Sequence, residues 1–194
     1  MIELLAPAGN EEKLKTALYF GADAVYLSGK KMGLRAFADN FDEEQLKSAV
    51  ELVHSLGKKV YVTVNILAKN ADFAELKDYL KYLDQICVDA VIVSDLGILS
   101  EVKKNTNLGV HISTQASVTN KYSAKFYESI GANRLVMARE LTLGEIKEIK
   151  EYLDDKTEIE AFVHGAMCIS YSGTLSTITM STSHKVAEQT PARI

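Results

Sequence analysis

The sequence alternates short apolar runs with longer amphipathic stretches, and this alternation constrains the fold more than any other feature. The apolar runs are rich in Val, Ile and Leu, as expected for strands that are buried on both faces of a sheet. They predict strands at residues 3–6, 24–28, 59–65, 90–94, 109–113, 134–138 and 158–163. The amphipathic stretches predict helices at residues 11–20, 42–56, 72–86, 97–105, 121–130 and 143–154.

The second predicted helix shows the local signals most clearly. Its apolar residues recur at helical spacing, at Leu46, Ala49, Val50 and Val53. Asp42 stands before it as an N-cap, and Gln45 follows in capping-box position. Gly57 and Gly131 stand where helices are expected to end.

Strands and helices in strict alternation with short connections predict a parallel sheet. Three similar segments, 21–25, 87–91 and 131–135, each end a helix and enter a strand. This recurrence favours a TIM-barrel-like (βα) repeat over a doubly wound α/β sheet. Because no eighth strand is evident, we expect an incomplete barrel over residues 1–173. Residues 174–194 are rich in Ser, Thr and other polar residues, and we expect an atypical, poorly ordered tail.

Length and composition place the chain among ordinary globular proteins. Its 194 residues can bury the core of one domain. A net charge of −4 gives no global sign of nucleic-acid binding. It does not exclude a local cluster of basic residues on the surface. We expect no signal peptide and no membrane span, and two cysteines do not make a disulfide framework. These features together predict a cytoplasmic protein.

In a (βα) barrel the active site lies at the carboxyl ends of the strands. The polar residues expected there are Arg35, Asn65, Asp95, Ser113, Gln115, Arg139, Glu140, His164 and Cys168. We assign substrate binding to four of them, namely Arg35, Asn65, Asp95 and Gln115. The candidate catalytic residues are Arg139, Glu140, His164 and Cys168, together with Glu160 within the last predicted strand. For any one of these residues, a helix cap or a solvated loop position is an equally good interpretation.

Other polar residues fall within the predicted elements. His111 lies inside a predicted strand, where it either lines the barrel or is a core histidine with satisfied hydrogen bonds. Cys87 stands at a helix-to-strand junction, and we expect a small buried apolar residue there. Tyr26 and Tyr61 are expected to pack within the sheet.

The segment 160–173 carries the most suggestive chemistry. His164 and Cys168 follow the last predicted strand and are four residues apart. Such a pair could form a thiolate nucleophile with its base, or His164 and Glu160 could hold a metal ion. No CxxC pair accompanies Cys168, so the segment does not complete a zinc or iron–sulfur site.

The same segment resembles the signature of peptidase family U32, the collagenase-like proteases, through Glu160, Phe162 and the run Gly165–Cys168. Residues 3–10, 21–26, 33–36 and 115–117 also resemble that family. The resemblance implies a TIM-barrel-like domain in a longer chain. It also implies relatives that act in hydroxylation: of uridine at the tRNA wobble position, of ribosomal RNA, or of ubiquinone.

The resemblance further implies a 4Fe–4S cluster held by four cysteines in longer relatives, with Cys168 as the first ligand. The second cysteine of the signature, expected shortly after Gly173, is absent here, where Thr174, Leu175 and Ser176 follow. We therefore expect a truncated or altered chain that holds no cluster.

Three functions remain open from the sequence. The first is an RNA-modification factor for tRNA 5-hydroxyuridine, in which Arg35 or Arg139 holds a phosphate or carboxylate. The second is a peptidase that uses Cys168 and His164 or a metal, acting on a peptide substrate. The third is a barrel fragment that binds but performs no chemistry. Open sheet edges also predict a homodimer, or a tail that covers the opening.

Overall fold

The computed structural model describes residues 2–33, 40–165 and 172. These residues form one parallel sheet whose strands lie side by side in chain order. The strands are β1 (Leu5–Pro7), β2 (Ala24–Ser28), β3 (Lys59–Val64), β4 (Ala90–Val93), β5 (Gly109–Ile112), β6 (Arg134–Val136) and β7 (Glu158–Glu160). The helices are α1 (Glu11–Tyr19), α2 (Glu43–Ser55), α3 (Phe73–Gln85), α4 (Leu96–Asn105), α5 (Lys121–Ser129) and α6 (Leu143–Tyr152).

The predicted alternation of strands and helices is confirmed, with ends that differ by a few residues. The largest difference is in β7, which ends at Glu160, although the sequence predicted a strand to residue 163. Two short 3-10 turns, Asn70–Asp72 and Thr114–Ala116, were not predicted. None of the helices in the described ranges is both long and apolar enough to cross a membrane.

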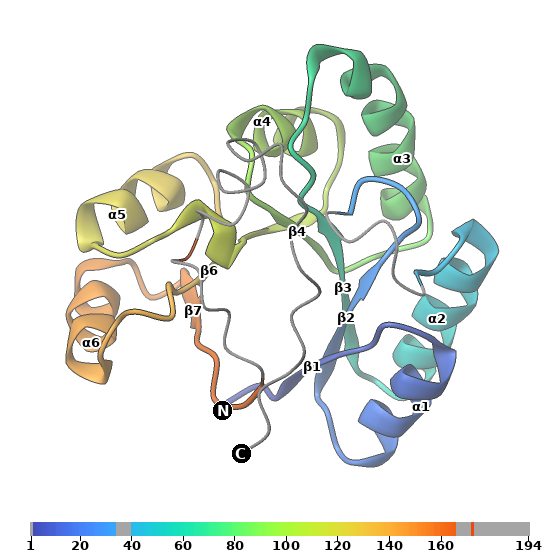
Figure 1. Ribbon diagram of the computed structural model, residues 1–194, viewed down its shortest axis with the longest axis horizontal. Coiled ribbons are helices and arrows are strands. Elements are labelled where there is room, and N and C mark those ends of the chain that lie inside the picture. Colours follow the sequence, from blue (N-terminus) through green and yellow to red (C-terminus); the bar gives the residue numbers. More distant parts are fainter. Residues whose placement is uncertain (1, 34–39, 166–171, 173–194) are drawn as a thin grey trace, which may run out of the picture.

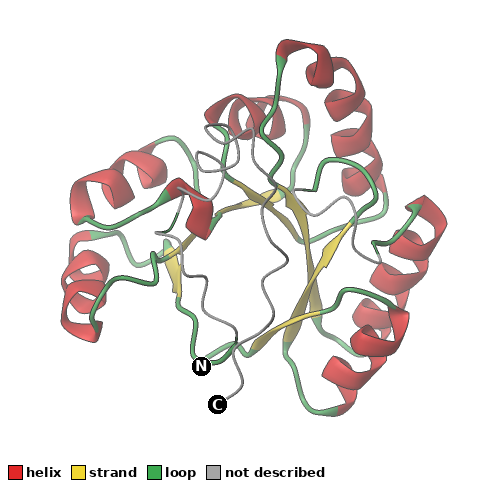
Figure 2. Cartoon of the chain, viewed as in Figure 1, coloured by secondary structure: helices red, strands yellow, loops and turns green. Residues whose placement is uncertain are grey.

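The sheet curves into an open barrel with all labelled helices on its outer side (Figures 1 and 2). Strands β1 and β7 are the two edges of the sheet, and they face one another across an open side at which the N-terminus lies (Figure 1). The prediction of an incomplete TIM-barrel-like fold is therefore confirmed.

Alternate residues of the strands serve two different packing layers. The outward residues, such as Val60, Val91 and Val110, are fully buried in the main core against the helices. The inward residues form a smaller cluster of Ala24, Tyr61, Ala90 and Ile92, with Leu5 and Tyr26 packed against it. Tyr26 and Tyr61 thus pack as predicted. Burial on both faces explains why the strands read as continuous apolar runs.

The helix ends follow the local signals in the sequence. Asp42 accepts a hydrogen bond from the Gln45 amide (3.0 Å), and the Gln45 side chain accepts one from the Asp42 amide (3.0 Å), which completes the predicted capping box. Helices α1 and α5 are followed by Gly21 and Gly131, each with φ of +96°. At this left-handed position a Cβ atom is disfavoured, so glycine is the preferred residue.

The corresponding position after α3 is Cys87, with φ of +63°. Its side chain is exposed, so the prediction of a buried residue was wrong. The reason is local geometry: the left-handed residue that ends the helix points away from the core, whatever its polarity. The three similar segments of the sequence are therefore one repeated turn, in which a cysteine replaces a glycine.

Candidate functional site

Polar side chains from β3 and the turn after β5 meet at the carboxyl ends of the strands. Asn65, which directly follows β3, donates a hydrogen bond from Nδ2 to Oε1 of Gln115 (2.6 Å). Ser113 donates to the same oxygen from Oγ (3.3 Å). The backbone of Asn65 is fixed in turn by a hydrogen bond from its amide to the Met32 carbonyl (3.0 Å). The structure thus brings together Asn65 and Gln115, two of the residues that the sequence assigned to substrate binding.

The 3-10 turn Thr114–Ala116 directs Gln115 toward this contact. Ser113 caps the turn by accepting a hydrogen bond from the Gln115 amide (3.3 Å), and Ser117 ends it in a left-handed conformation with φ of +51°. A tight turn at this point places Gln115 close to the strand end. In this orientation the side-chain carbonyl oxygen of Gln115 accepts from two donors, and its side-chain amide nitrogen donates to no other residue in the described ranges.

A second polar group joins the loops after β5 and β6 to Ser172. Ser172 is almost fully buried, with 1% of its surface exposed. Its amide donates to Oε1 of Glu140 (2.7 Å), its Oγ accepts from the Arg139 amide (3.4 Å), and its carbonyl accepts from Ser117 Oγ. Burial works against ionisation of Glu140, but the hydrogen bonds from Ser172 outweigh it and lower the pKa of the carboxyl. Glu140 and Arg139, both predicted as catalytic, therefore contact the signature segment here.

Asp95 has a structural role in this region. Its Oδ1 accepts a hydrogen bond from the Ile98 amide (2.9 Å), so the carboxylate caps the first turn of α4. Arg35 and Cys168, the other predicted site residues with charge or thiol chemistry, lie outside the described residues.

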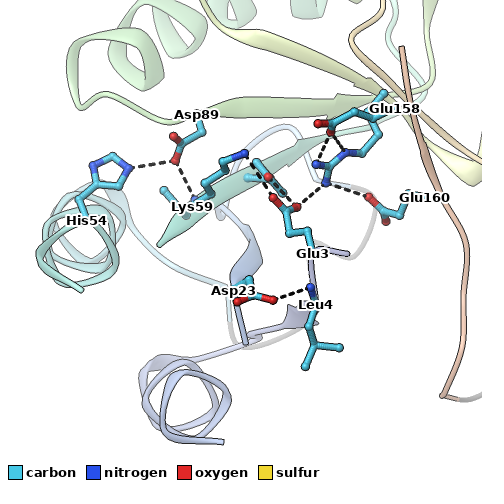
Figure 3. Close-up of polar contacts among 11 residues, drawn as sticks. Glu3, Leu4, Asp23, His54, Lys59, Asp89, Glu158 and Glu160 are labelled. Carbon is cyan, nitrogen blue, oxygen red and sulfur yellow. Dashed lines mark hydrogen bonds and ion pairs between the residues drawn. The ribbon is translucent and has the colours of Figure 1, made fainter. Parts of the chain in front are cut away.

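The last strand carries Glu160, which points into the barrel toward the amino ends of the strands (Figure 3). There it approaches Arg134, the centre of a charged network. Arg134 donates from Nη1 to Oε1 of Glu3 (2.7 Å) and from Nε to Oε2 of Glu158 (2.8 Å), and its guanidinium lies 5.1 Å from the centre of the Tyr61 ring. One buried cation thus holds residues from the two edges of the sheet.

Glu160 is the least satisfied member of the network. Its Oε2 lies 3.6 Å from Nη1 of Arg134, beyond hydrogen-bond distance, and this buried oxygen has no hydrogen-bond partner in the part of the chain that the structure describes. Burial raises the pKa of the Glu160 carboxyl, although Arg134 opposes the shift. His164 lies beyond the strand end and is exposed. Glu160 therefore faces the barrel interior while His164 is exposed beyond the strand end. This arrangement does not bring the two side chains together as a metal site or a catalytic pair.

His111 lies in the same interior, 5% exposed, with its ring 4.5 Å from the Tyr61 ring in an edge-on arrangement. Burial, with a contribution from Arg134, lowers the pKa of the imidazole to about 3. The side chain is therefore a neutral core histidine at physiological pH. Its Nδ1 has no hydrogen-bond partner within the described ranges, so it is not the satisfied core residue that the sequence allowed for.

The residues present do not fit an iron–sulfur cluster of four cysteine ligands. The whole chain contains two cysteines, and Cys87 follows α3 at the amino end of β4. Among the residues that the structure describes, no three His, Cys, Asp or Glu side chains group as metal ligands. Cys168 as a metal ligand remains a prediction.

A cavity of about 360 Å³ lies beside the barrel mouth, between the loop after β2 and helices α2 and α3. It is lined by Gly29, Lys30, Lys31, Phe41, Asp42, Glu43, Glu44, Leu46 and Tyr79. The Tyr79 hydroxyl is buried and, in the described parts of the chain, has no hydrogen-bond partner. Lys30 pairs with Asp42, the N-cap of α2, and Lys31 pairs with Glu43 of α2 and Glu75 of α3, so the cavity presents no unpaired cation from these two lysines.

Comparison with known proteins identifies the family. The model of peptidase family U32 matches residues 9–188, which is most of the chain. The chain belongs to peptidase family U32. The match continues past Gly173, the point at which the resemblance in the sequence ended.

Several relatives are named for RNA hydroxylation, whereas one from Methanocaldococcus jannaschii, 45% identical over 89% of this chain and 43% of that protein, is named an uncharacterized protease. The chain is 48% identical over 172 residues to tRNA hydroxylation protein P1 of Bacillus subtilis, covering 88% of this chain and 40% of that protein. It is 40% identical to tRNA hydroxylation protein P of Escherichia coli, covering 88% of this chain and 38% of that protein. It is 38% identical to the 23S rRNA 5-hydroxycytidine C2501 synthase of E. coli, covering 89% of this chain and 26% of that protein.

Solved structures support the fold. A U32 peptidase superposes with a TM-score of 0.69 at 18% identity, covering 82% of this chain and 68% of that one. Thiamine phosphate pyrophosphorylase from Pyrococcus furiosus superposes with a TM-score of 0.59 at 18% identity, covering 84% and 76%. The chain spans 43% or less of the four relatives named above, so the activity of a whole relative does not transfer to it directly.

Proposed function

We propose that this chain is the barrel part of a factor that helps to form 5-hydroxyuridine at the wobble position of tRNA, and that alone it lacks a complete active site. The observation that carries the proposal is its 48% identity, over 88% of its length, to a protein named for tRNA hydroxylation. A relative named for cytidine hydroxylation in ribosomal RNA supports the same class of reaction on another pyrimidine.

The polar cluster at the barrel mouth supports recognition of a pyrimidine. Asn65 and Gln115 carry side-chain amides, which match the donors and acceptors on the edge of a uracil ring. Their mutual hydrogen bond and the one from Ser113 fix the amides before a base binds. Such fixed polar groups discriminate among bases because an unmatched partner is left without a hydrogen bond.

Hydroxylation of a base also needs chemistry that side chains do not supply. Insertion of oxygen at a ring carbon requires an oxygen source and removes two electrons from the base, so a redox cofactor is required. This chain, with two cysteines, cannot provide four thiolates. We infer that the redox group is held by sequence that this chain lacks, with Cys168 as the ligand contributed from the barrel side.

The test is deletion of the intact gene in its host, followed by mass spectrometry of tRNA nucleosides. Loss of 5-hydroxyuridine derivatives, restored by the intact gene, is expected. The intact gene with Gln115→Leu is expected not to restore them, whereas Gln85→Leu, at the exposed end of α3, serves as the matched control and should restore them. Unchanged 5-hydroxyuridine derivatives after deletion would refute the proposal.

The peptidase alternative is tested separately with the purified chain. Turnover of a collagen peptide that is abolished by Cys168→Ala would favour a thiol peptidase over the RNA proposal. In the described geometry Glu160 faces Arg134 while His164 is exposed, and this arrangement does not favour a peptidase that combines these two residues.

A further inference from the structure

Helix α5 directs aromatic side chains outward. Its exposed residues are Tyr122, Phe126 and Ser129, and the two aromatic ones are 69% and 53% exposed. Tyr122 and Phe126 are four residues apart and therefore lie on the same side of the helix. Helices α2 and α3, which the structure describes throughout, expose no large apolar side chain. The outward side of α5 thus differs from that of a helix whose outer side faces only water.

Helix α6 extends the same surface. It lies beside α5 on the outer side of the barrel, and Tyr152 in its last turn is 46% exposed (Figure 1). The rings of Tyr122 and Tyr152 meet edge-on, with centroids 5.9 Å apart. Tyr122, Phe126 and Tyr152 together form the aromatic face of the two helices.

A lysine holds two rings of the aromatic face in place. Nζ of Lys121 lies 5.8 Å from the centre of the Tyr122 ring and 5.5 Å from the centre of the Tyr152 ring. A cation over both rings restricts their motion before any partner is present. Side chains that are already ordered lose less conformational entropy on association, so these rings are suited to an interface.

The charged residues around the aromatic face are paired with one another. Lys121 pairs with Glu148 (2.6 Å), and Lys125 pairs with Asp154 (3.1 Å) and with Glu128. Helix α5 carries two lysines and one glutamate, and α6 carries two lysines and three glutamates, so four cations balance four anions. A surface without an excess of positive charge is a poor match for the phosphates of RNA.

The size of the aromatic face suits the centre of a protein interface. A fully exposed aromatic side chain offers roughly 200 Å², so the exposed fractions of the three rings leave roughly 300–350 Å² open to a partner. A stable interface buries roughly 800 Å² on each partner. Aromatic residues are enriched at the centre of such interfaces, and charged residues at the rim. The aromatic face supplies such a centre, and the paired lysines and acids supply the rim.

A second copy of the chain matches the charges of this surface. The counts of lysine and glutamate give α5 a net charge of +1 and α6 a net charge of −1. In a dimer whose two-fold axis runs along the helices, α5 of one copy lies over α6 of the other. Opposite net charges then meet on both sides of the axis, and the aromatic side chains of the two copies meet at the centre.

We propose that α5 and α6 form the interface of a homodimer, with the aromatic face at its centre and a two-fold axis roughly parallel to the helices. The elements of a (βα) barrel run roughly along the barrel axis, so this rotation leaves the carboxyl ends of the strands of both copies on the same side. The polar clusters around Asn65 and Gln115 then open in the same direction in the two copies. The dimer does not depend on the proposed action on tRNA.

The test follows the mass of the 194-residue chain by sedimentation velocity and light scattering over a range of concentrations. A reversible dimer is expected. Tyr122→Glu and Phe126→Glu should each raise the dissociation constant of the dimer by about tenfold or more, because each places a charge at the centre of an apolar contact. Tyr19→Glu is the matched control, since Tyr19 is an aromatic residue that is 84% exposed at the end of α1. It should dimerise as the parent chain does.

Thermal unfolding shows whether the variants fold. The substituted side chains are largely exposed, so the midpoint of the monomeric variants should stay close to that of the parent chain. Tyr122→Ser removes the ring without adding a charge, and it gives the same comparison if a glutamate variant does not fold.

Cross-linking tests the direction of the axis. Cys87 and Cys168 are replaced by serine, and Phe126→Cys and Tyr152→Cys are made in separate chains that are then mixed at concentrations at which both are dimeric. A short bismaleimide should join the Phe126→Cys chain to the Tyr152→Cys chain faster than it joins either chain to itself. Preferential joining of like chains, or no joining, would overturn the proposed arrangement.

Other results would overturn the dimer itself. A parent chain that stays monomeric at every concentration is one of them. A dimer that is unaffected by both glutamate variants would place the interface elsewhere. Binding of a single-stranded RNA oligonucleotide that falls steeply with salt and is lost in Tyr122→Glu, in a chain that remains monomeric, would assign the aromatic face to RNA instead.

Discussion

Arg134 offers the most direct test of how the open barrel is held together. The side chain is 7% exposed and forms charge-assisted hydrogen bonds to Glu3 and Glu158. Arg134→Met keeps most of the volume but removes the cation shared by Glu3, Glu158 and Glu160, of which Glu3 keeps an ion pair with Lys59 (3.3 Å). Removing one partner of a buried pair is strongly destabilising, because the remaining charge stays buried.

The size of the loss follows from the exposure of each partner. The bond to Glu3, whose side chain is 23% exposed, contributes about 1.5–3 kcal/mol, as expected for hydrogen bonds to charged groups. Glu158 is 56% exposed, so solvent screening reduces its share to about 0.5–1 kcal/mol. We therefore expect Arg134→Met to lower the free energy of unfolding by about 2–4 kcal/mol at pH 7.

The loss should depend on pH with a defined sign. Burial raises the pKa of Glu3, but hydrogen bonds from Arg134 and Tyr61 outweigh it, so the folded pKa is lowered. A lowered carboxyl pKa contributes stability that is present above its unfolded value and is lost as pH falls through the folded value. In Arg134→Met the part of this contribution that comes from Arg134 is absent, whereas Tyr61 and Lys59 still lower the pKa of Glu3. The difference in stability between the two proteins should therefore shrink below about pH 4.5.

Urea unfolding at pH 7 and at pH 4 measures both quantities. Lys147→Met is the control, because Lys147 pairs with Glu151 on the surface at 3.8 Å and both side chains are mostly exposed. It should change stability by less than about 0.5 kcal/mol. A loss below about 1 kcal/mol for Arg134→Met, or one that is equal at both pH values, would show that the network does not stabilise the fold as argued.

Three further predictions concern local geometry. Cys87→Gly should raise the free energy of unfolding by about 0.5–1.5 kcal/mol in urea, because glycine relieves the left-handed backbone, while Cys87→Ala should not. Gly29→Ala should lower the free energy of unfolding by about 1–3 kcal/mol, because the new Cβ would clash with the Tyr79 hydroxyl. Tyr79→Phe removes that hydroxyl and should restore part of the loss in a double-mutant cycle. Full additivity of the two substitutions would contradict the clash. Asp42→Ala should cost about 1 kcal/mol in the same assay through loss of the capping box, and a value near zero would show that the cap is dispensable.

The elements themselves could be predicted because their signals are local. The spacing of Asp42 and Gln45 alone predicts a capping box, and the structure contains it. The strand predicted to residue 163 ends at Glu160, since Phe162 and Val163 are exposed and apolar character alone does not make a strand. Cys87 was misjudged because the turn geometry, which no composition rule includes, decides its exposure.

The site was less predictable because it depends on register and on turns. Asn65 and Gln115 were chosen only as strand-end residues, and their contact requires the 3-10 turn after β5, which the sequence did not indicate. Glu160 was a candidate metal ligand with His164, but its side chain faces the barrel interior and approaches Arg134 near the amino ends of the strands. Ser172 has no chemical signal of its own, and its position within the family signature was the one available clue.

The pairing of each strand with its neighbour in sequence has a consequence for how the chain folds. Contacts within the sheet join successive units, so assembly can proceed unit by unit at a small cost in loop closure. The hydrogen bond between Arg134 and Glu3 joins residues that are 131 positions apart, and it can form only when the strands from β1 to β6 have assembled. The rate of that last step should therefore respond to ionic strength, whereas formation of the early strands should not.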